Sequence, residues 1–190
     1  MKKLAVFFPG IGYTVDKPLM HYGRRLAMSL GYEVKLLPYG GFPEKKPGDT
    51  DRIRRSFEIA LAQSEEMLSG LDFSEYEDIL FIGKSIGTIA AAKIASESPA
   101  KDRIRLILYT PLPETFLPDF GSAVVFTGTD DPWVGKEKSP IPALSAKRGI
   151  PCHLIEGGNH SLESADIGKD ILTVRKIMEI TEAFIRARED

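Results

Sequence analysis

Residues 79–95 read ILFIGKSIGTIAAAKIA, and this stretch decides the fold of the 190-residue chain. Ile79–Ile82 is a continuous apolar run, as expected for a strand that is covered on both faces. The next residues, Gly83-Lys84-Ser85-Ile86-Gly87, match the pattern G-x-S-x-G, and the small-residue segment Ile86–Ala95 predicts a helix directly after the turn. A buried strand that turns sharply into a helix is typical of a parallel α/β sheet.

Short apolar segments on either side of this stretch alternate with longer segments of helical period. We predict six strands in all: Leu4–Phe8, Glu33–Leu37, Ile79–Ile82, Ile104–Tyr109, Ala123–Phe126 and His153–Ile155. Strands that alternate with helices predict a mainly parallel six-stranded sheet, in a three-layer α/β/α arrangement with right-handed crossovers.

Three further helices are expected around these strands. Asp16, followed by Lys17-Pro18, is expected to cap a helix that ends near Leu30. Asp51–Ser69 and Ile171–Arg186 repeat apolar residues at spacings near 3.6, which indicates helices packed on the sheet. On the last helix the expected buried stripe consists of Ile171, Val174, Ile177, Met178, Thr181 and Ile185. Two long loops rich in Pro and Gly are also expected, at Tyr39–Asp49 and Thr110–Gly121.

Composition narrows the class of protein. The length predicts one domain over residues 1–190, and 43% apolar with 27% charged residues is ordinary for a soluble globular chain. A net charge of −2 gives no basic face for nucleic acid or for an anionic membrane. The single cysteine, Cys152, cannot form an internal disulfide, which favours a cytoplasmic location. No exposed apolar stripe is evident beyond those facing the sheet, so we expect a monomer or a weak homodimer.

Two glycine motifs resemble phosphate-binding sites, but neither meets the requirements of one. Gly83-Lys84-Ser85 resembles the end of a P-loop, but the residues before it form a strand, which cannot wrap a phosphate. Gly10-Ile11-Gly12 is a lone G-x-G, and no acid follows the second strand to bind a ribose. Because the chain also lacks a Cys/His cluster and a His-Glu-x-x-His helix, we expect no cofactor and no metal.

The G-x-S-x-G turn is better explained as the seat of a nucleophile. A serine between a strand and a helix takes a strained conformation, and the free N–H groups of the helix start favour a negatively charged oxygen nearby. A serine hydroxyl needs a base, and the chain has three histidines. His21 is expected on a helix surface and His153 within the sheet. His160 lies in a loop just past the last strand, at the edge where open α/β sheets bind ligands.

An acid that orients this histidine should lie between the serine and the histidine in the chain, also just past a strand. Asp130 and Asp131 both follow the predicted strand Ala123–Phe126. Either carboxylate is suited to accept the imidazole N–H and to stabilise the imidazolium, so this reasoning leaves both open.

The order Ser85, Asp131, His160 resembles that of the α/β-hydrolase superfamily. The acid loop looks like the family's G-x-x-D-P pattern counted from Gly128, which selects Asp131. Gly157-Gly158-Asn159-His160-Ser161 is similar to the family's histidine loop. Phe8-Pro9-Gly10-Ile11-Gly12 stands where members carry a His-Gly segment, although here Pro9 replaces the histidine.

The resemblance implies a minimal α/β-hydrolase fold that lacks the first two strands and a cap domain, with strand order 2-1-3-4-5-6. It places the oxyanion donors at the backbone N–H groups of Ile11 and Ile86. The expected substrate-binding residues are Gly10, Gly12, Tyr13, Phe116 and Trp133. Leu112, Leu117, Phe120 and Phe42 are also candidates for an acyl pocket, or alternatively for plugging the end of the sheet.

These residues predict a small, lidless serine hydrolase, similar to carboxylesterases and thioesterases, that acts on a small-molecule acyl substrate through an acyl-enzyme. The bond cleaved, whether ester, thioester, amide or lactone, stays open. Rival hypotheses are an acyltransferase with the same triad, a lyase or perhydrolase, and a binding protein without turnover. Lys84 is expected to be solvated or salt-bridged, and recognition of an anionic substrate is the alternative.

Overall fold

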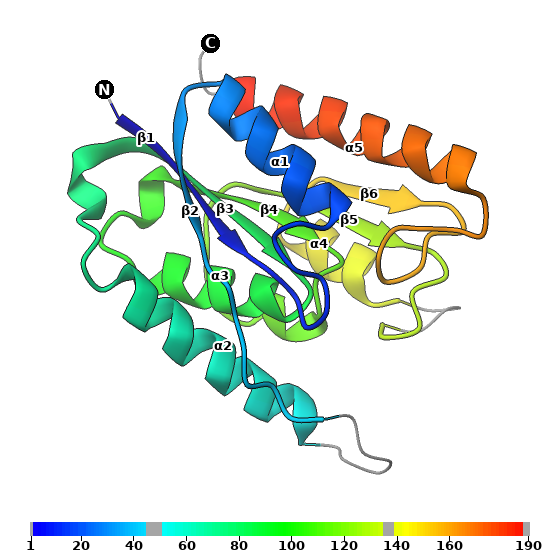
Figure 1. Cartoon of the computed structure of the whole chain (residues 1–190), viewed down its shortest axis with the longest axis horizontal. Helices are drawn as coiled ribbons and strands as arrows, with labels where there is room; N and C mark the ends of the chain where they lie inside the picture. Colours follow the sequence, from blue (N-terminus) through cyan, green and yellow to red (C-terminus); the bar gives the residue numbers. More distant parts are fainter. Residues whose placement is uncertain (1, 45–50, 135–138, 188–190) are drawn as a thin grey trace.

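The computed structural model describes residues 2–44, 51–134 and 139–187 (Figure 1). Its elements follow in the order β1 (Lys2–Phe8), α1 (Pro18–Ser29), β2 (Tyr32–Leu36), α2 (Arg52–Leu68), η1 (Phe73–Glu75), β3 (Tyr76–Lys84), α3 (Ile86–Glu97), η2 (Lys101–Arg103), β4 (Ile104–Tyr109), η3 (Pro113–Phe116), β5 (Ala123–Gly128), α4 (Ile141–Lys147), β6 (Cys152–Ile155) and α5 (Ile167–Arg186). Part of the expected loop Tyr39–Asp49 lies outside the described residues.

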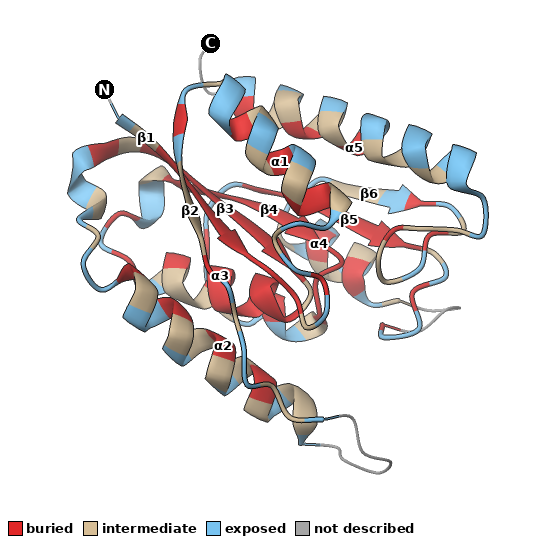
Figure 2. Ribbon diagram, in the orientation of Figure 1, coloured by how far each residue is buried: buried red, intermediate tan, exposed pale blue. Residues whose placement is uncertain are grey.

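The six strands form one parallel sheet in the order β2-β1-β3-β4-β5-β6, which confirms the predicted topology. Helices α1 and α5 cover one face, and α2, α3 and α4 cover the other (Figure 1). Two apolar cores therefore lie on the two sides of the sheet, and the central strands are buried along their length (Figure 2). This burial explains why Ile79–Ile82 of β3 is a continuous apolar run rather than an alternating one.

Arg105 of β4 ties α5 to the sheet at the end opposite the strands' carboxyl termini. Its guanidinium is buried, contacts the Asp78 carboxylate at 2.7 Å and donates hydrogen bonds to the backbone oxygens of Phe184 and Ile185. A buried cation beside the last carbonyls of a helix is placed where the helix dipole is negative. The C-terminal half of α5 is thereby fixed, and it is this half that packs on the sheet.

Two sequence predictions about helices were wrong. The residue that caps the start of α1 is Lys17 rather than Asp16, and it makes no side-chain capping bond. Ile171, expected on the buried stripe of α5, is 65% exposed. Helix α5 has 20 residues, about 30 Å, whereas its neighbour β6 has four, about 13 Å, so the start of the helix extends past the sheet.

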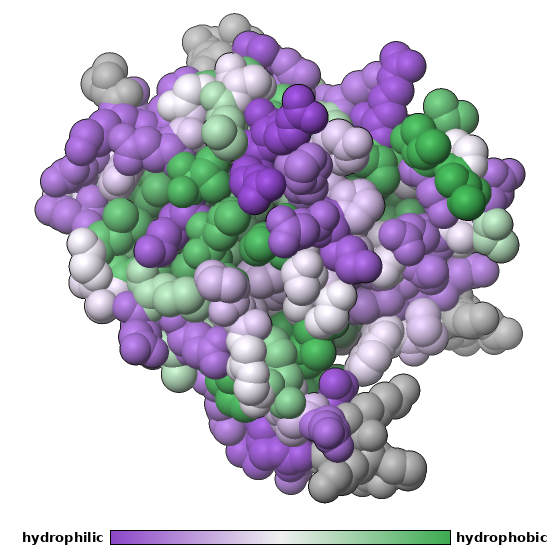
Figure 3. Space-filling view, viewed as in Figure 1, coloured by the Kyte–Doolittle hydropathy of each residue, from purple (hydrophilic) through white to green (hydrophobic). Residues whose placement is uncertain are grey.

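The surface over the start of α5 carries exposed apolar side chains, among them Ile167, Ile171 and Leu172 (Figure 3). The sequence-based expectation of a monomer or weak homodimer rested on the absence of such a patch, and that premise does not hold. Among the described residues, no helix combines the length and the apolar character needed to cross a membrane.

Candidate active site

Ser85 lies at the sharp turn between β3 and α3, with backbone angles φ 54° and ψ −122°. Positive φ is costly for a residue with a side chain, so the surrounding chain must enforce it. Gly87 shows how: a Cβ there would stand 2.1 Å from the backbone oxygen of Phe8 and 2.4 Å from that of Pro9. Only glycine lets the start of α3 approach the end of β1 this closely, as expected for the G-x-S-x-G pattern.

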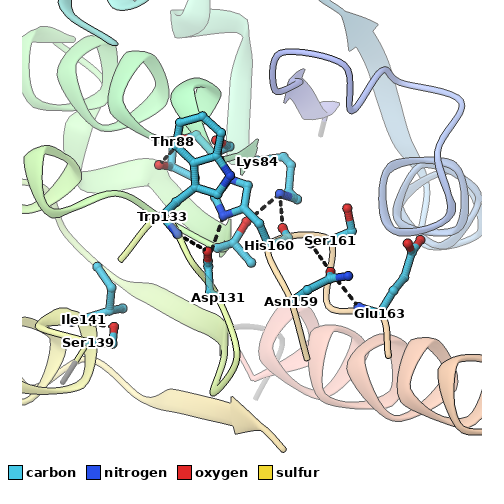
Figure 4. A network of polar contacts seen from close by, with 12 residues as sticks. Lys84, Thr88, Asp131, Trp133, Ser139, Ile141, Asn159, His160, Ser161 and Glu163 are labelled. Carbon is cyan, nitrogen blue, oxygen red and sulfur yellow. Dashed lines mark hydrogen bonds and ion pairs between the residues drawn. The ribbon is translucent and has the colours of Figure 1, made fainter. Parts of the chain in front are cut away.

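His160 bridges Ser85 and Asp131. Its Nε2 lies 2.7 Å from Ser85 Oγ and its Nδ1 lies 2.7 Å from Asp131 Oδ2 (Figure 4 shows Asp131 and His160). An ionised carboxylate only accepts hydrogen bonds, so Nδ1 carries the imidazole proton and Nε2 accepts from the serine hydroxyl. The structure thus brings together the three residues that the sequence selected, in the arrangement of a nucleophile, a base and an orienting acid.

The structure separates the two candidate acids. Asp131 is fully buried, and its Oδ1 accepts the Trp133 backbone N–H at 2.9 Å. Asp130 is exposed, and the His160 imidazole contacts Asp131 instead. The acid and histidine loops touch at Gly128, where a Cβ would stand 2.0 Å from the backbone oxygen of Gly158. This contact fixes the separation of Asp131 and His160.

The environment of His160 keeps its imidazole in the neutral form. Burial and the nearby Lys84 ammonium lower its pKa, while the hydrogen bond to Asp131 opposes them, and the net shift is downward. A histidine with a lowered pKa is unprotonated at neutral pH, as a general base must be.

Lys84, expected to be solvated or salt-bridged, is instead 1% exposed. Its Nζ donates to the His160 backbone oxygen at 2.6 Å (Figure 4) and to Thr110 Oγ1 at 2.5 Å. It also stands 4.8 Å from the centre of the Tyr13 ring. The prediction failed because the loops carrying Tyr13 and His160 close over the carboxyl end of β3, and sequence spacing does not show this.

A cavity of about 140 Å³ opens beside Ser85. Its lining consists of Ile11, Arg52, Ile53, Ser85, Ile86, Leu112, Trp133 and His160. Within the described part of the chain, the backbone N–H groups of Ile11 and Ile86 donate to no other residue. The two N–H groups expected to hold an oxyanion thus belong to residues that line the same cavity as the serine.

The remaining predicted binding residues divide into two groups. Trp133 lines the cavity, with its ring 5.6 Å from that of His160, and a Cβ on Gly10 would stand 3.2 Å from Ser85 Cβ. Gly12, Tyr13 and Phe116 do not line it. Gly12 is exposed, Tyr13 accepts a hydrogen bond from the Leu19 backbone and supports Lys84, and Phe116 packs against Phe120.

Sequence reasoning missed Arg52 and Ile53, which begin α2 and line the cavity. Ile53 belongs to the segment Asp51–Ser69, for which the sequence predicted only a helix packed on the sheet. The available signal was topological: a helix that follows a parallel strand begins at the carboxyl edge of the sheet, where ligands bind. Arg52 Nε donates to the Pro43 backbone oxygen at 3.1 Å, which orients its guanidinium.

No protein-family model matches the chain, and no curated protein matches it. Solved structures do match. They include an alpha-beta serine hydrolase homologue from Coxiella burnetii, with a TM-score of 0.60 and 17% identity, covering 94% of this chain and 84% of that one. An esterase from Pyrococcus furiosus matches with a TM-score of 0.64 and 12% identity, covering 98% and 82%.

Thermogutta terrifontis esterase 2, in a form phosphonylated by cyclosarin, matches with a TM-score of 0.59 and 20% identity, covering 97% of this chain and 82% of that one. At such identities the likeness concerns architecture. The chain has the α/β-hydrolase fold, as the resemblance in its sequence implied.

Proposed function

We propose that this protein is a serine hydrolase that cleaves a small acyl ester or thioester through Ser85, His160 and Asp131. The observation that carries the proposal is the continuous hydrogen-bonded chain from the Ser85 hydroxyl through the imidazole to a buried carboxylate, seated on a strained strand-to-helix turn. Each part supplies something that acyl transfer needs: a nucleophile, a base of lowered pKa and a fixed counter-charge.

In the first half-reaction, Ser85 Oγ attacks the carbonyl carbon while His160 Nε2 takes its proton. Negative charge moves to the carbonyl oxygen, where the backbone N–H groups of Ile11 and Ile86 are the donors that we assign to it. Asp131 stabilises the imidazolium that forms. The imidazolium then gives its proton to the departing alcohol or thiol, and the acyl group stays on Ser85.

In the second half-reaction, water attacks the acyl-enzyme. His160 takes a proton from the water, a second tetrahedral intermediate forms at the same donors, and its collapse releases the carboxylic acid. The proton held by His160 returns to Ser85 Oγ, which restores the starting state.

The cavity supports a short acyl group. Its volume of about 140 Å³ is well below the roughly 300–1,000 Å³ of typical ligand pockets. Ile11, Ile53, Ile86 and Leu112 are apolar lining residues, and Arg52 is a charged residue of the same lining. Guanidinium groups pair well with carboxylates, so a short acyl chain that carries a carboxylate fits this lining better than a neutral chain of equal length.

A series of 4-nitrophenyl esters and thioesters of increasing acyl length tests the proposal. We expect kcat/KM to be highest for acyl groups of two to about four carbons and to fall for longer chains. Ser85→Ala should abolish turnover. Added alcohols, amines and thiols separate hydrolysis from acyl transfer, because a transferase would yield the acylated acceptor as the main product. Equal rates for wild type and Ser85→Ala would contradict the proposal.

A further inference from the structure

Lys84 is buried directly beside the serine, yet the steps above do not use it. It is the last residue of β3, and its side chain passes beneath the histidine loop rather than into the cavity. Its ammonium has two short hydrogen bonds, to Thr110 Oγ1 and to the His160 backbone oxygen. Burying a charged group this completely is costly unless it is paired and hydrogen-bonded, so its presence calls for an explanation.

We propose that Lys84 is a positioning residue for His160: its ammonium holds the backbone oxygen of His160 and so keeps the imidazole between Ser85 and Asp131. The inference rests on the proposed function, since it assigns Lys84 a part in the work of the same triad.

The contacts of the histidine loop explain why such a tie is needed. Bonds from the Asn159 side chain and backbone connect the loop to itself, at Ser161, Leu162 and Glu163. Gly157 and Gly158 bind the acid loop through Thr129 and Asp130. The Lys84 bond links the backbone of His160 itself to the end of β3, the residue directly before Ser85. It therefore connects the two chain segments that carry the partners of the Ser85–His160 hydrogen bond.

The positive charge of Lys84 has a second consequence. The groups that face it are the Tyr13 ring, His160 and the carboxylates of Asp131 and Glu163. Burial lowers the pKa of Lys84 to about 7, although the two carboxylates act to raise it. Lys84 is therefore positively charged in the more acidic range in which His160 titrates. There it repels a second positive charge and helps to lower the pKa of His160.

Two substitutions separate the hydrogen bond from the charge. Lys84→Met removes both and leaves the His160 oxygen without its donor. Lys84→Gln removes the charge but keeps an N–H donor. Lys93→Met is the matched control, because Lys93 lies on α3, pairs with Glu97 and is partly exposed. The readouts are kcat and KM for a short ester and the rate of Ser85 labelling by a fluorophosphonate, both measured from pH 5 to 9.

For Lys84→Met we expect kcat and the labelling rate to fall about 10- to 100-fold with little change in KM, since displacing a reacting group by about 1 Å can cost 10²-fold. The acid limb of both profiles should move to higher pH, because the charge that lowers the pKa of His160 is gone. Lys84→Gln should be faster than Lys84→Met, because it keeps a donor, and its acid limb should also lie at higher pH than that of wild type. Lys93→Met should match wild type.

The failures are distinguishable. Wild type that neither labels nor turns over would overturn the proposed function itself. Active wild type together with a folded Lys84→Met that has the same kcat and the same acid limb would overturn the positioning role alone. If Lys84→Met does not fold, Lys84→Gln decides in its place: wild-type kcat with an unshifted limb contradicts the inference, and a shifted limb supports it.

Discussion

At the scale of single residues, the environment of each side chain sets what it can do. His160 has a carboxylate on one nitrogen and a hydroxyl on the other, and burial holds it neutral. Asp131 is buried with two donors, while its neighbour Asp130 is exposed. The two acids differ by one position in the chain, yet only one of them can orient the base.

This difference predicts unequal effects of two matched substitutions. Asp131→Asn should lower kcat by about 10⁴, because an amide that donates to Nδ1 would favour the wrong tautomer, as in the serine-protease triad from which that magnitude comes. Asp130→Asn should leave kcat within about twofold of wild type. Steady-state kinetics of both variants on one short ester make the comparison, and similar losses in the two would rule out the assigned acid.

Arg52 is the residue through which the cavity should select its substrate. We expect a 4-nitrophenyl ester of a short dicarboxylic acid to have a higher kcat/KM than the neutral ester of equal length. Arg52→Gln should reduce this preference by about 10- to 100-fold, the loss expected for one charge-assisted hydrogen bond. The control is Arg54→Gln, on the exposed side of α2, where Arg54 pairs with Glu58. An unchanged ratio of the two esters in Arg52→Gln would contradict the role.

At the scale of elements, the site depends on how closely neighbouring segments approach. The start of α3 presses on the end of β1 at Gly87, and the acid loop presses on the histidine loop at Gly128. These two contacts set the Ser85 turn and the Asp131–His160 separation, respectively. A shift of either would reach the hydrogen bonds of the triad directly.

Gly87→Ala tests the first contact. Its Cβ would lie 2.1 Å from the Phe8 oxygen, so the helix start must move away from β1. We expect a loss of about 1–3 kcal/mol or more in unfolding free energy, typical of overpacking, together with loss of turnover. Gly70→Ala is the control, since nothing lies within 4 Å of its Cβ position. Chemical denaturation of both variants checks this. A Gly87→Ala protein as stable as Gly70→Ala would show that the contact is not tight.

The elements that could be predicted from the sequence are those whose signal is local. Residues 79–95 indicated a strand, a turn and a helix, and the G-x-S-x-G pattern located Ser85 and its strained backbone. Helix α4 (Ile141–Lys147) was not predicted. It has only seven residues, and its first turn contains a proline, which is tolerated at that position.

Contacts between distant segments could not be predicted in this way. Arg52 reaches the cavity and Lys84 is buried only because loops far apart in the sequence meet at one sheet edge. A charged residue in a single sequence is most often exposed, and only packing reveals the exceptions. Tyr13 illustrates the same point, since its predicted place in the binding site turned out to be beneath Lys84.

At the scale of the whole molecule, the two ends of the sheet differ in their tasks. The carboxyl edge holds Ser85, Asp131 and His160, whereas the opposite end holds the buried pair of Asp78 and Arg105. Lys84 adds a second buried cation at the carboxyl edge. Part of the stability of the fold is therefore linked to protonation at the site.

This linkage predicts how stability depends on pH. The pKa of Lys84 is about 7 in the fold against an ordinary value of 10.5, so between these values the unfolded chain binds a proton that the folded chain releases. Unfolding free energy should then rise with pH across this window, and stay level with respect to this group below it. Urea titrations from pH 6 to 10 should give the unfolding free energy of wild type and of Lys84→Met. The value for wild type minus the value for Lys84→Met should increase with pH. A constant difference would contradict the shift.

The central claim is that Ser85 is an activated nucleophile, and one measurement tests it most directly. Folded protein near neutral pH is treated with a fluorophosphonate, and intact mass and peptide mapping follow. Wild type should gain a single adduct located on Ser85, while Ser85→Ala gains none and His160→Ala reacts far more slowly. No adduct on wild type, or an adduct elsewhere that persists in Ser85→Ala, would contradict the claim and favour a binding protein without turnover.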